Sequence, residues 1–192
     1  MYEAVFFDLD GTLYNKRGLS ARLIWAALRR GRPCLRLLAL ERKVRRRLLA
    51  GSKAGLEDLY AGIALRAKLP VEAVRTWYNE WYMPAMTAAL RHYKPDESVM
   101  AKVRMFKAAG VKVAILSDYC CVREKFEALG GDPAIFDALL DAPSLGGFKP
   151  CPDVFRAACA SLGVDPARSA MLGDRPDTDG GCVSVDMTYI PR

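Results

Sequence analysis

Short apolar runs without polar interruption recur along the chain and predict buried β-strands. Residues 4–7 and 111–116 are the clearest examples, and each is followed by a cluster of polar residues. Residues 169–172 and 188–190 are two shorter candidates. Continuous apolar runs of this length are typical of parallel strands that are covered on both faces.

Helical spacing of apolar residues fills the intervals between these strands. It is found in residues 98–109, 122–129 and 152–162, and each segment is followed by a glycine, a frequent helix stop. Because strand and helix alternate, the pattern predicts an α/β fold built on a parallel sheet.

Residues 19–91 have a different pattern, with helical spacing and almost no strand alternation. We expect about four helices there, inserted after the first strand. The sequence therefore predicts two units. An α/β core comes from residues 1–15 and 93–192, and a helical insertion comes from residues 16–92.

Charge separates the same two parts of the chain. The net charge is +7, but residues 16–91 hold 17 Lys and Arg against 5 Asp and Glu, whereas the other residues hold 12 against 17. The basic tract at residues 29–47 is most simply a solvated helix face. Two functional alternatives are an electropositive surface that attracts small anionic substrates and a surface for nucleic acid or anionic lipid.

Composition excludes several classes of protein. With 52% hydrophobic and 27% charged residues, the chain is neither disordered nor fibrous. No apolar stretch approaches the roughly 18 residues that a membrane helix needs, and the first residues lack the pattern of a signal peptide. We therefore expect a cytoplasmic protein.

Two carboxylates follow the first predicted strand. Asp8 and Asp10 stand two residues apart, so an extended backbone directs both to the same side of the sheet, at the edge where α/β proteins bind ligands. Their negative charges repel unless a cation or a shared proton compensates, and a divalent metal ion is the simplest solution. Gly11 permits a sharp turn, and the Thr12 hydroxyl can hold a carboxylate in place.

Polar residues also follow the later predicted strands. These residues are Ser117 with Asp118, Lys149 before Pro150, and Asp174 with Asp179. Parallel topology would bring them to the edge of the sheet that carries Asp8. A hydroxyl, a cation and several carboxylates are the groups that magnesium-assisted phosphoryl transfer uses.

These motifs, in this order, resemble those of the haloacid dehalogenase-like (HAD) hydrolase superfamily. The four motifs are Asp8-Leu9-Asp10-Gly11-Thr12, Ser117-Asp118, Lys149-Pro150 and Gly173-Asp174 with Asp179. The resemblance covers residues 1–14 and about 93–191. It implies a Rossmann-like α/β core, and the place of the insertion resembles the helical cap called C1.

The resemblance also implies a role for each motif residue. Asp8 would be the nucleophile, and Asp10 would donate and then accept a proton. Ser117 and Lys149 would contact the phosphoryl group, and Thr12 and Asp118 are counted with them as phosphate-binding residues. Mg²⁺ is the implied cofactor, with Asp8, the Asp10 carbonyl, Asp174 and Asp179 as its ligands.

The implied activity is a phosphatase that hydrolyses a small phosphorylated metabolite through an aspartyl-phosphate. The second aspartate, Asp10, favours phosphate esters, because the dehalogenase and phosphonate-cleaving branches lack it. Two alternatives stay open at this point. One is a phosphomutase of the same architecture, and the other is a non-catalytic protein that binds nucleic acid or another partner through its basic cap.

Overall fold

A computed structural model describes residues 1–49 and 54–192. Within these residues, parallel strands form one five-stranded sheet in the order β3-β2-β1-β4-β5. The strands are β1 (Ala4–Phe7), β2 (Lys112–Ser117), β3 (Ala138–Asp141), β4 (Ser169–Gly173) and β5 (Thr188–Pro191). This confirms the expected Rossmann-like α/β fold.

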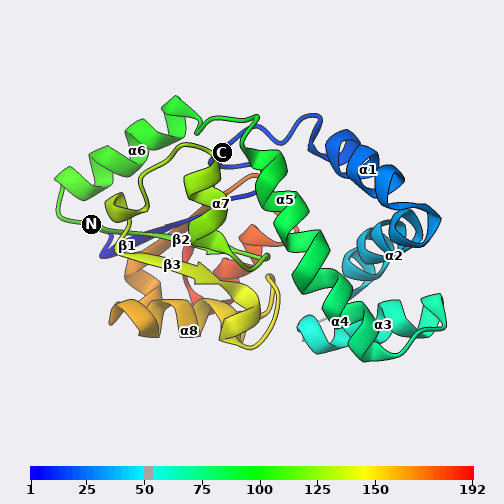
Figure 1. Cartoon of the computed structure of the whole chain (residues 1–192). Helices are drawn as coiled ribbons and strands as arrows, with labels where there is room; N and C mark the ends of the chain where they lie inside the picture. The colour runs from blue at the N-terminus through cyan, green and yellow to red at the C-terminus, as the bar shows by residue number, and fades with distance from the viewer. Residues whose placement is uncertain (50–53) are drawn as a thin grey trace.

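Helices cover both faces of the sheet (Figure 1). Because side chains alternate along β1, successive residues pack against helices on opposite faces. Val5 and Phe7 pack with residues of α6 (Glu97–Ala108) and α7 (Val122–Ala128). Ala4 and Phe6 pack with α8 (Pro152–Leu162) on the opposite face. All four side chains are fully buried, which explains why β1 has no polar position.

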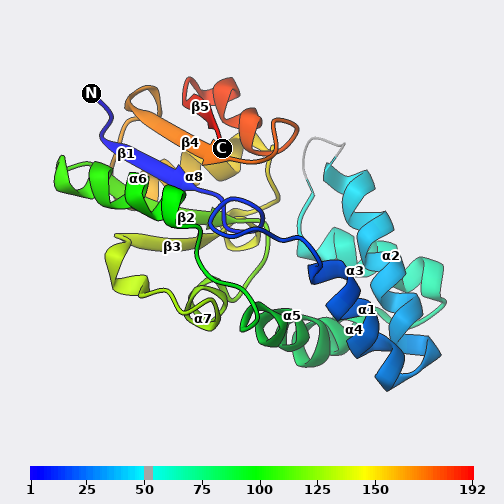
Figure 2. The same cartoon turned by 90° about the horizontal axis from the view of Figure 1, so that it is seen from above.

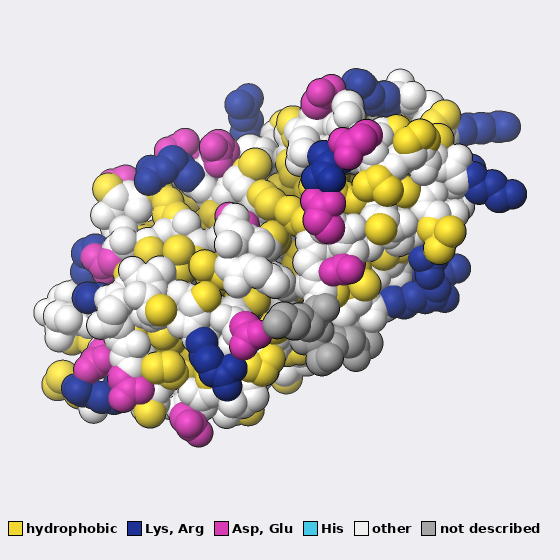
Figure 3. Space-filling view, turned by 90° about the horizontal axis from the view of Figure 1, so that it is seen from below, with side chains coloured by type: hydrophobic (Ala, Val, Ile, Leu, Met, Phe, Trp, Pro, Cys, Tyr) yellow, Lys and Arg dark blue, Asp and Glu magenta, His cyan; other side chains and the backbone are white. Residues whose placement is uncertain are grey.

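The remaining helices form a separate group beside the sheet (Figure 2). They are α1 (Leu19–Arg30), α2 (Arg32–Leu49), α3 (Leu56–Ala67), α4 (Val71–Trp77) and α5 (Met83–Leu90). A π-helical turn, Tyr78–Tyr82, joins α4 to α5, so the pair runs as one long rod. The described part of the insertion thus consists of four helical rods. Lys and Arg side chains lie along its outer rim in Figure 3.

Strand β3 was not foreseen from the sequence. It is an edge strand of four residues, and all four are only half-buried, so the Ala-Leu-Leu run is too short to stand out from a loop. Short 3₁₀ turns fill several connections, at Pro133–Ile135, Ala142–Leu145, Pro166–Arg168 and Asp179–Val185.

The topology brings the carboxyl ends of β1, β2 and β4 side by side. Helix α6 leads from β1 to β2 on one face, and α8 precedes β4 on the other, so the strand order reverses between β1 and β4. Ligands of open α/β sheets bind at such a reversal point. Among the described residues, no helix is long and apolar enough to cross a membrane.

Candidate active site

Lys149 is the centre of the buried polar cluster at this edge. Its side chain is fully buried, and its ammonium group donates to Asp8 Oδ1 at 2.9 Å, Asp179 Oδ1 at 2.6 Å and the Leu116 carbonyl at 3.0 Å. These three bonds use all the donors of a lysine. Burial by itself lowers the pKa of Lys149, but the Asp8, Asp118 and Asp179 carboxylates outweigh it and raise that pKa above its usual value. Lys149 therefore stays charged and fixes two carboxylates.

Asp10 is held by a second set of donors. Tyr14 donates its hydroxyl to Asp10 Oδ1 at 2.7 Å, Ser117 donates to Oδ2 at 3.2 Å, and the ammonium of Lys125 pairs with the same Oδ2. Burial by itself raises the pKa of the Asp10 carboxyl, but the charge and hydrogen bond of Lys125, with Tyr14 and Ser117, lower it below its usual value. Asp10 is consequently ionised in this arrangement.

Three carboxylates come close enough to share one metal ion. Asp8, Asp174 and Asp179 each offer an oxygen, and these oxygens lie within 4.8 Å of one another. Asp174 Oδ1 is buried and has no hydrogen-bond partner among the described residues, as expected of an oxygen whose partner is a cation. Burial raises the pKa of Asp179; the Lys149 charge opposes this rise and the Asp8 charge adds to it. An oxygen-only donor set of this kind fits Mg²⁺.

A side-chain cation already stands at part of this group. The Lys16 ammonium donates to Asp174 Oδ2 at 2.7 Å and to the Asp10 carbonyl at 2.9 Å. These are two of the oxygens that the family resemblance assigns to the metal. The ammonium shows that these two oxygens can bind one cation together.

Asp118 and Thr12 differ in how far they match the expectations. Asp118 lines the pocket described below, and its Oδ1 accepts the backbone N–H of Lys149 at 2.8 Å. Burial raises the pKa of the Asp118 carboxyl although Lys149 acts against this. The Thr12 hydroxyl is fully buried and has no hydrogen-bond partner among the described residues. The expectation that it holds a carboxylate in place is therefore wrong for this structure. The turn after Asp10 directs it into the protein instead.

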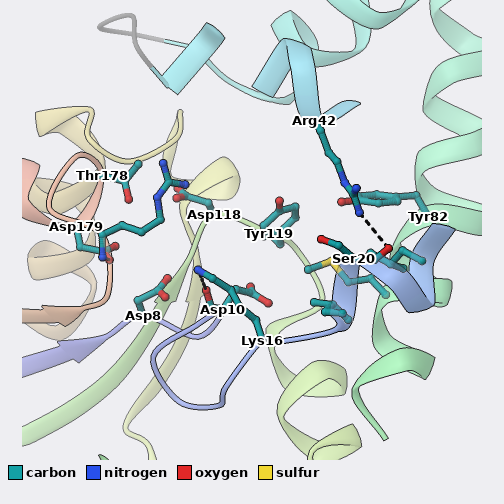
Figure 4. Close-up of a pocket in the computed structure, with 14 residues that line it drawn as sticks. Asp8, Asp10, Lys16, Ser20, Arg42, Tyr82, Asp118, Tyr119, Thr178 and Asp179 are labelled. Atoms are coloured by element: carbon teal, nitrogen blue, oxygen red, sulfur yellow. Dashed lines mark hydrogen bonds between the residues drawn. The ribbon is translucent and has the colours of Figure 1, made fainter. Parts of the chain in front are cut away.

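A pocket of about 220 Å³ opens above these carboxylates and reaches the helical insertion. Figure 4 shows Asp8, Asp10 and Asp179 on its sheet side, and Ser20, Arg42 and Tyr82 on its helical side. Tyr82 is the last residue of the π-helical turn. The pocket therefore has one wall that carries the polar cluster and one wall from the inserted helices.

Comparison with known proteins identifies the family. A family model described as haloacid dehalogenase-like hydrolase matches residues 2–180. The chain belongs to this family. Phosphoglycolate phosphatase of Thiobacillus denitrificans is 29% identical over 185 residues, which are 90% of this chain and 74% of that protein.

Solved HAD-like structures have the same fold. CbbY from Rhodobacter sphaeroides, in complex with phosphate, is 25% identical with a TM-score of 0.70, and the match covers 100% of this chain and 86% of CbbY. An L-2-haloacid dehalogenase from Xanthobacter autotrophicus is 21% identical with a TM-score of 0.64, over 98% and 76% of the two chains, and shows the shared fold alone. The expected HAD-like family is confirmed, and the expectation of a phosphatase is supported by several relatives that are named phosphatases.

Three basic residues of this HAD-like site were missed from the sequence. Lys16 was counted only in the charge of the insertion, and Lys125 was given no role within the helix predicted over residues 122–129. Arg45 belongs to the tract interpreted as a solvated face, yet it is buried. It pairs with Glu41 at 2.6 Å and donates to the Asp118 carbonyl at 3.3 Å. The i,i+4 spacing of Glu41 and Arg45 is a signal in the sequence that could have indicated this pair.

Proposed function

We propose that the protein is a Mg²⁺-dependent phosphomonoester hydrolase that acts on a small phosphorylated metabolite. The observation that carries this proposal is the arrangement around Asp8. Asp8 Oδ1 is held by Lys149, and the Asp8 carboxylate also offers an oxygen, with Asp174 and Asp179, to a group fit for one metal ion. The phosphatases among its relatives support the same reaction.

In the proposed reaction, Asp8 is the nucleophile. A carboxylate oxygen attacks the phosphorus, the bond from phosphorus to the ester oxygen breaks, and an aspartyl-phosphate forms. Water then attacks the same phosphorus and releases inorganic phosphate and the Asp8 carboxylate. Lys149, which touches Asp8 directly, keeps this carboxylate in place and balances negative charge that develops on the phosphoryl group.

Asp10 is proposed to move the proton. It would donate to the leaving oxygen in the first step and accept a proton from water in the second. Lys125 favours the ionised form that the second step requires. A dianionic phosphate ester beside Asp10 acts in the opposite direction and favours the protonated form that the first step requires.

Mg²⁺ would be held by the carboxylates of Asp8, Asp174 and Asp179 and by the Asp10 carbonyl. Bound there, it would supply positive charge that screens the phosphoryl oxygens from the surrounding carboxylates. Ser117, whose hydroxyl now bonds Asp10 and accepts from the Tyr119 N–H, is proposed to turn toward a phosphoryl oxygen.

We propose that residues 16–92 act as a cap over this site. Lys16, Ser20, Arg42 and Tyr82 from this segment line the same pocket as Asp8. A cap that covers the pocket excludes bulk water while the aspartyl-phosphate exists.

The test compares Asp8→Asn with a matched control, Asp186→Asn. Both variants make the same change, but Asp186 is exposed and lies outside the pocket. We expect Asp8→Asn to lose Mg²⁺-dependent hydrolysis of an aryl phosphate by more than about a thousandfold, while the control keeps it. Unchanged circular dichroism shows that the fold survives. Full activity in Asp8→Asn would refute the mechanism.

The same assay separates the alternative functions. A phosphatase releases one free phosphate for each ester consumed, whereas a phosphomutase consumes its substrate with little free phosphate. A non-catalytic protein would release none with or without Mg²⁺.

A further inference from the structure

The pocket extends well beyond the groups that the proposed reaction uses. Its helical end holds Arg42, from the middle of α2, with the side chain directed toward Ser20 and Tyr82 (Figure 4). Neither the proposed nucleophilic step nor the metal site requires a guanidinium at this end. Arg42 therefore needs a separate explanation.

The other cations that line this pocket have carboxylate partners. Lys16 pairs with Asp174 at 2.7 Å, and Arg175 pairs with Asp177, with Nε and Oδ1 3.2 Å apart. Arg42 has no carboxylate within ion-pair distance among the described residues. Its one hydrogen bond there is a long one, 3.5 Å, to the Ser20 carbonyl. A half-buried guanidinium with so weak a partner keeps most of its donors for a ligand.

The position of Arg42 relative to the reaction centre is fixed by its neighbour on α2. Arg45 is buried, donates to the Asp118 carbonyl, and stacks on the ring of Tyr119, with 4.2 Å between the guanidinium carbon and the ring centroid. Because Asp118 follows β2, this contact ties α2 to the edge that carries the catalytic cluster. Arg42 is one helical turn from that contact and faces the same pocket.

The space between the two ends suits a short carbon skeleton. Leu19, Leu23 and Met86 line the pocket on the helical side and offer apolar contact. A volume of about 220 Å³ is large enough for a phosphate ester of a few carbon atoms. The basic residues on the outer rim do not share this enclosure.

We propose that Arg42 binds a second anionic group of the substrate, so that the substrate is a compact phosphate ester with a carboxylate or second phosphate at its far end. This inference rests on the proposed function and specifies its substrate class. A guanidinium binds either anion with two parallel hydrogen bonds, so the chemistry is shared and the test distinguishes the two sources.

The experiment compares three esters, with Mg²⁺ present throughout. Phosphoglycolate carries a carboxylate, ethylene glycol bisphosphate carries a second phosphate, and ethyl phosphate carries neither. The variants are Arg42→Met, Arg42→Lys and, as a matched control, Lys43→Met, which removes a charge from the adjacent exposed position.

We expect Arg42→Met to lower kcat/KM for at least one of the two esters that carry a second anion. The loss should be about 10- to 100-fold greater than for ethyl phosphate. The ester that shows this excess identifies the anion. Arg42→Lys keeps the charge without the paired donors and should recover part of the loss. Lys43→Met should change the three esters equally and by less than about threefold.

Binding without turnover makes the inference testable even if hydrolysis is absent. Calorimetric titration with phosphonopropionate and propylphosphonate, which are not hydrolysed, gives the affinity for a ligand with and without the second anion. The wild type should prefer phosphonopropionate, and Arg42→Met should lose that preference.

The two proposals fail in different ways. A wild type that hydrolyses none of the esters contradicts the proposed phosphatase, while the phosphonate titrations still decide the role of Arg42. Equal losses in Arg42→Met for ligands with and without the second anion overturn the second-anion inference, as does an equal loss of discrimination in Lys43→Met. Either result leaves the phosphatase standing.

Discussion

Lys125 gives the sharpest quantitative test of the charge arrangement. Its side chain is fully buried, its ammonium pairs with Asp10, and it lies 5.0 Å from the centroid of the Tyr119 ring. We consider Lys125→Met, which keeps the length of the side chain and removes the charge. The variant leaves the Asp10 carboxylate, whose side chain is only 12% exposed, without its cation.

The loss of stability in Lys125→Met depends on the hydrogen bonds that the Asp10 carboxylate retains. Removing one partner of a buried ion pair costs about 3–5 kcal/mol. Asp10 retains hydrogen bonds from Tyr14 and Ser117 and some contact with solvent, so we expect the lower end, about 3 kcal/mol. For a domain of this length, that corresponds to a fall in Tm of about 6–12 °C.

Urea unfolding of a double-mutant cycle measures this energy. Lys125→Met, Asp10→Asn and the double variant are compared with the wild type. The double variant should be about 2 kcal/mol more stable than Lys125→Met, because it buries no unpaired charge. Lys107→Met breaks a half-exposed ion pair with Asp137 and is the control, with an expected cost below about 1 kcal/mol.

Acid unfolding adds an independent check on the same pair. Because the folded protein lowers the pKa of Asp10 below its usual 3.8, Asp10 stabilises the fold above that pH and loses this contribution as the pH falls through the folded pKa. In Lys125→Met that pKa rises, so the stability of the variant should depend less on pH below 3.8. A Lys125→Met protein as stable as wild type, or a double variant no more stable than the single one, would refute the reasoning.

The other predictions concern Lys16 and Arg45. Lys16→Met should bind Mg²⁺ about 3- to 10-fold more tightly in calorimetric titration, because the ammonium competes for Asp174 and the Asp10 carbonyl; unchanged or weaker binding would contradict this competition. Arg45→Met should lower the unfolding free energy by about 3–5 kcal/mol, since it leaves the fully buried Glu41 unpaired. Adding Glu41→Gln to Arg45→Met should restore part of this stability, and no recovery would show that lost packing, not charge, is responsible.

The sheet and the edge that carries the site could be predicted from the sequence because they depend only on buried apolar runs and on parallel strand order. The buried runs at β1, β2 and β4 are recognisable, and parallel strands necessarily bring their carboxyl ends together. Asp8, Ser117 and Asp174 were therefore expected at one edge before their distances were known. The four-residue edge strand β3 lacks a comparable signal, since it is only half-buried.

Lys149 was expected at this edge, but the other cations of the site could not be predicted in the same way. Lys125 and Arg45 lie on helices whose charged residues face solvent except for buried Glu41 and half-buried Arg42. Their burial depends on how α7 and α2 pack against the loop after β2. A charged residue on an amphipathic helix is usually exposed. Only tertiary structure shows which of the 29 Lys and Arg residues are paired with a buried acid.

The balance of charge among the carboxylates and lysines at this edge of the sheet explains why the site needs cations from more than one source. Five carboxylates, those of Asp8, Asp10, Asp118, Asp174 and Asp179, lie near three lysines, so their formal charge is −2. Buried Lys149 and Lys125 each pair with carboxylates that the proposed reaction uses. Neither ammonium group can move away without leaving a buried carboxylate unpaired. The Lys16 side chain is 43% exposed, so its ammonium group can move away from Asp174 into solvent. A dianionic phosphate can enter this negative cluster only if further positive charge accompanies it. In our proposal, that charge comes from the metal ion at Asp174 on one side and from Arg42 on the other.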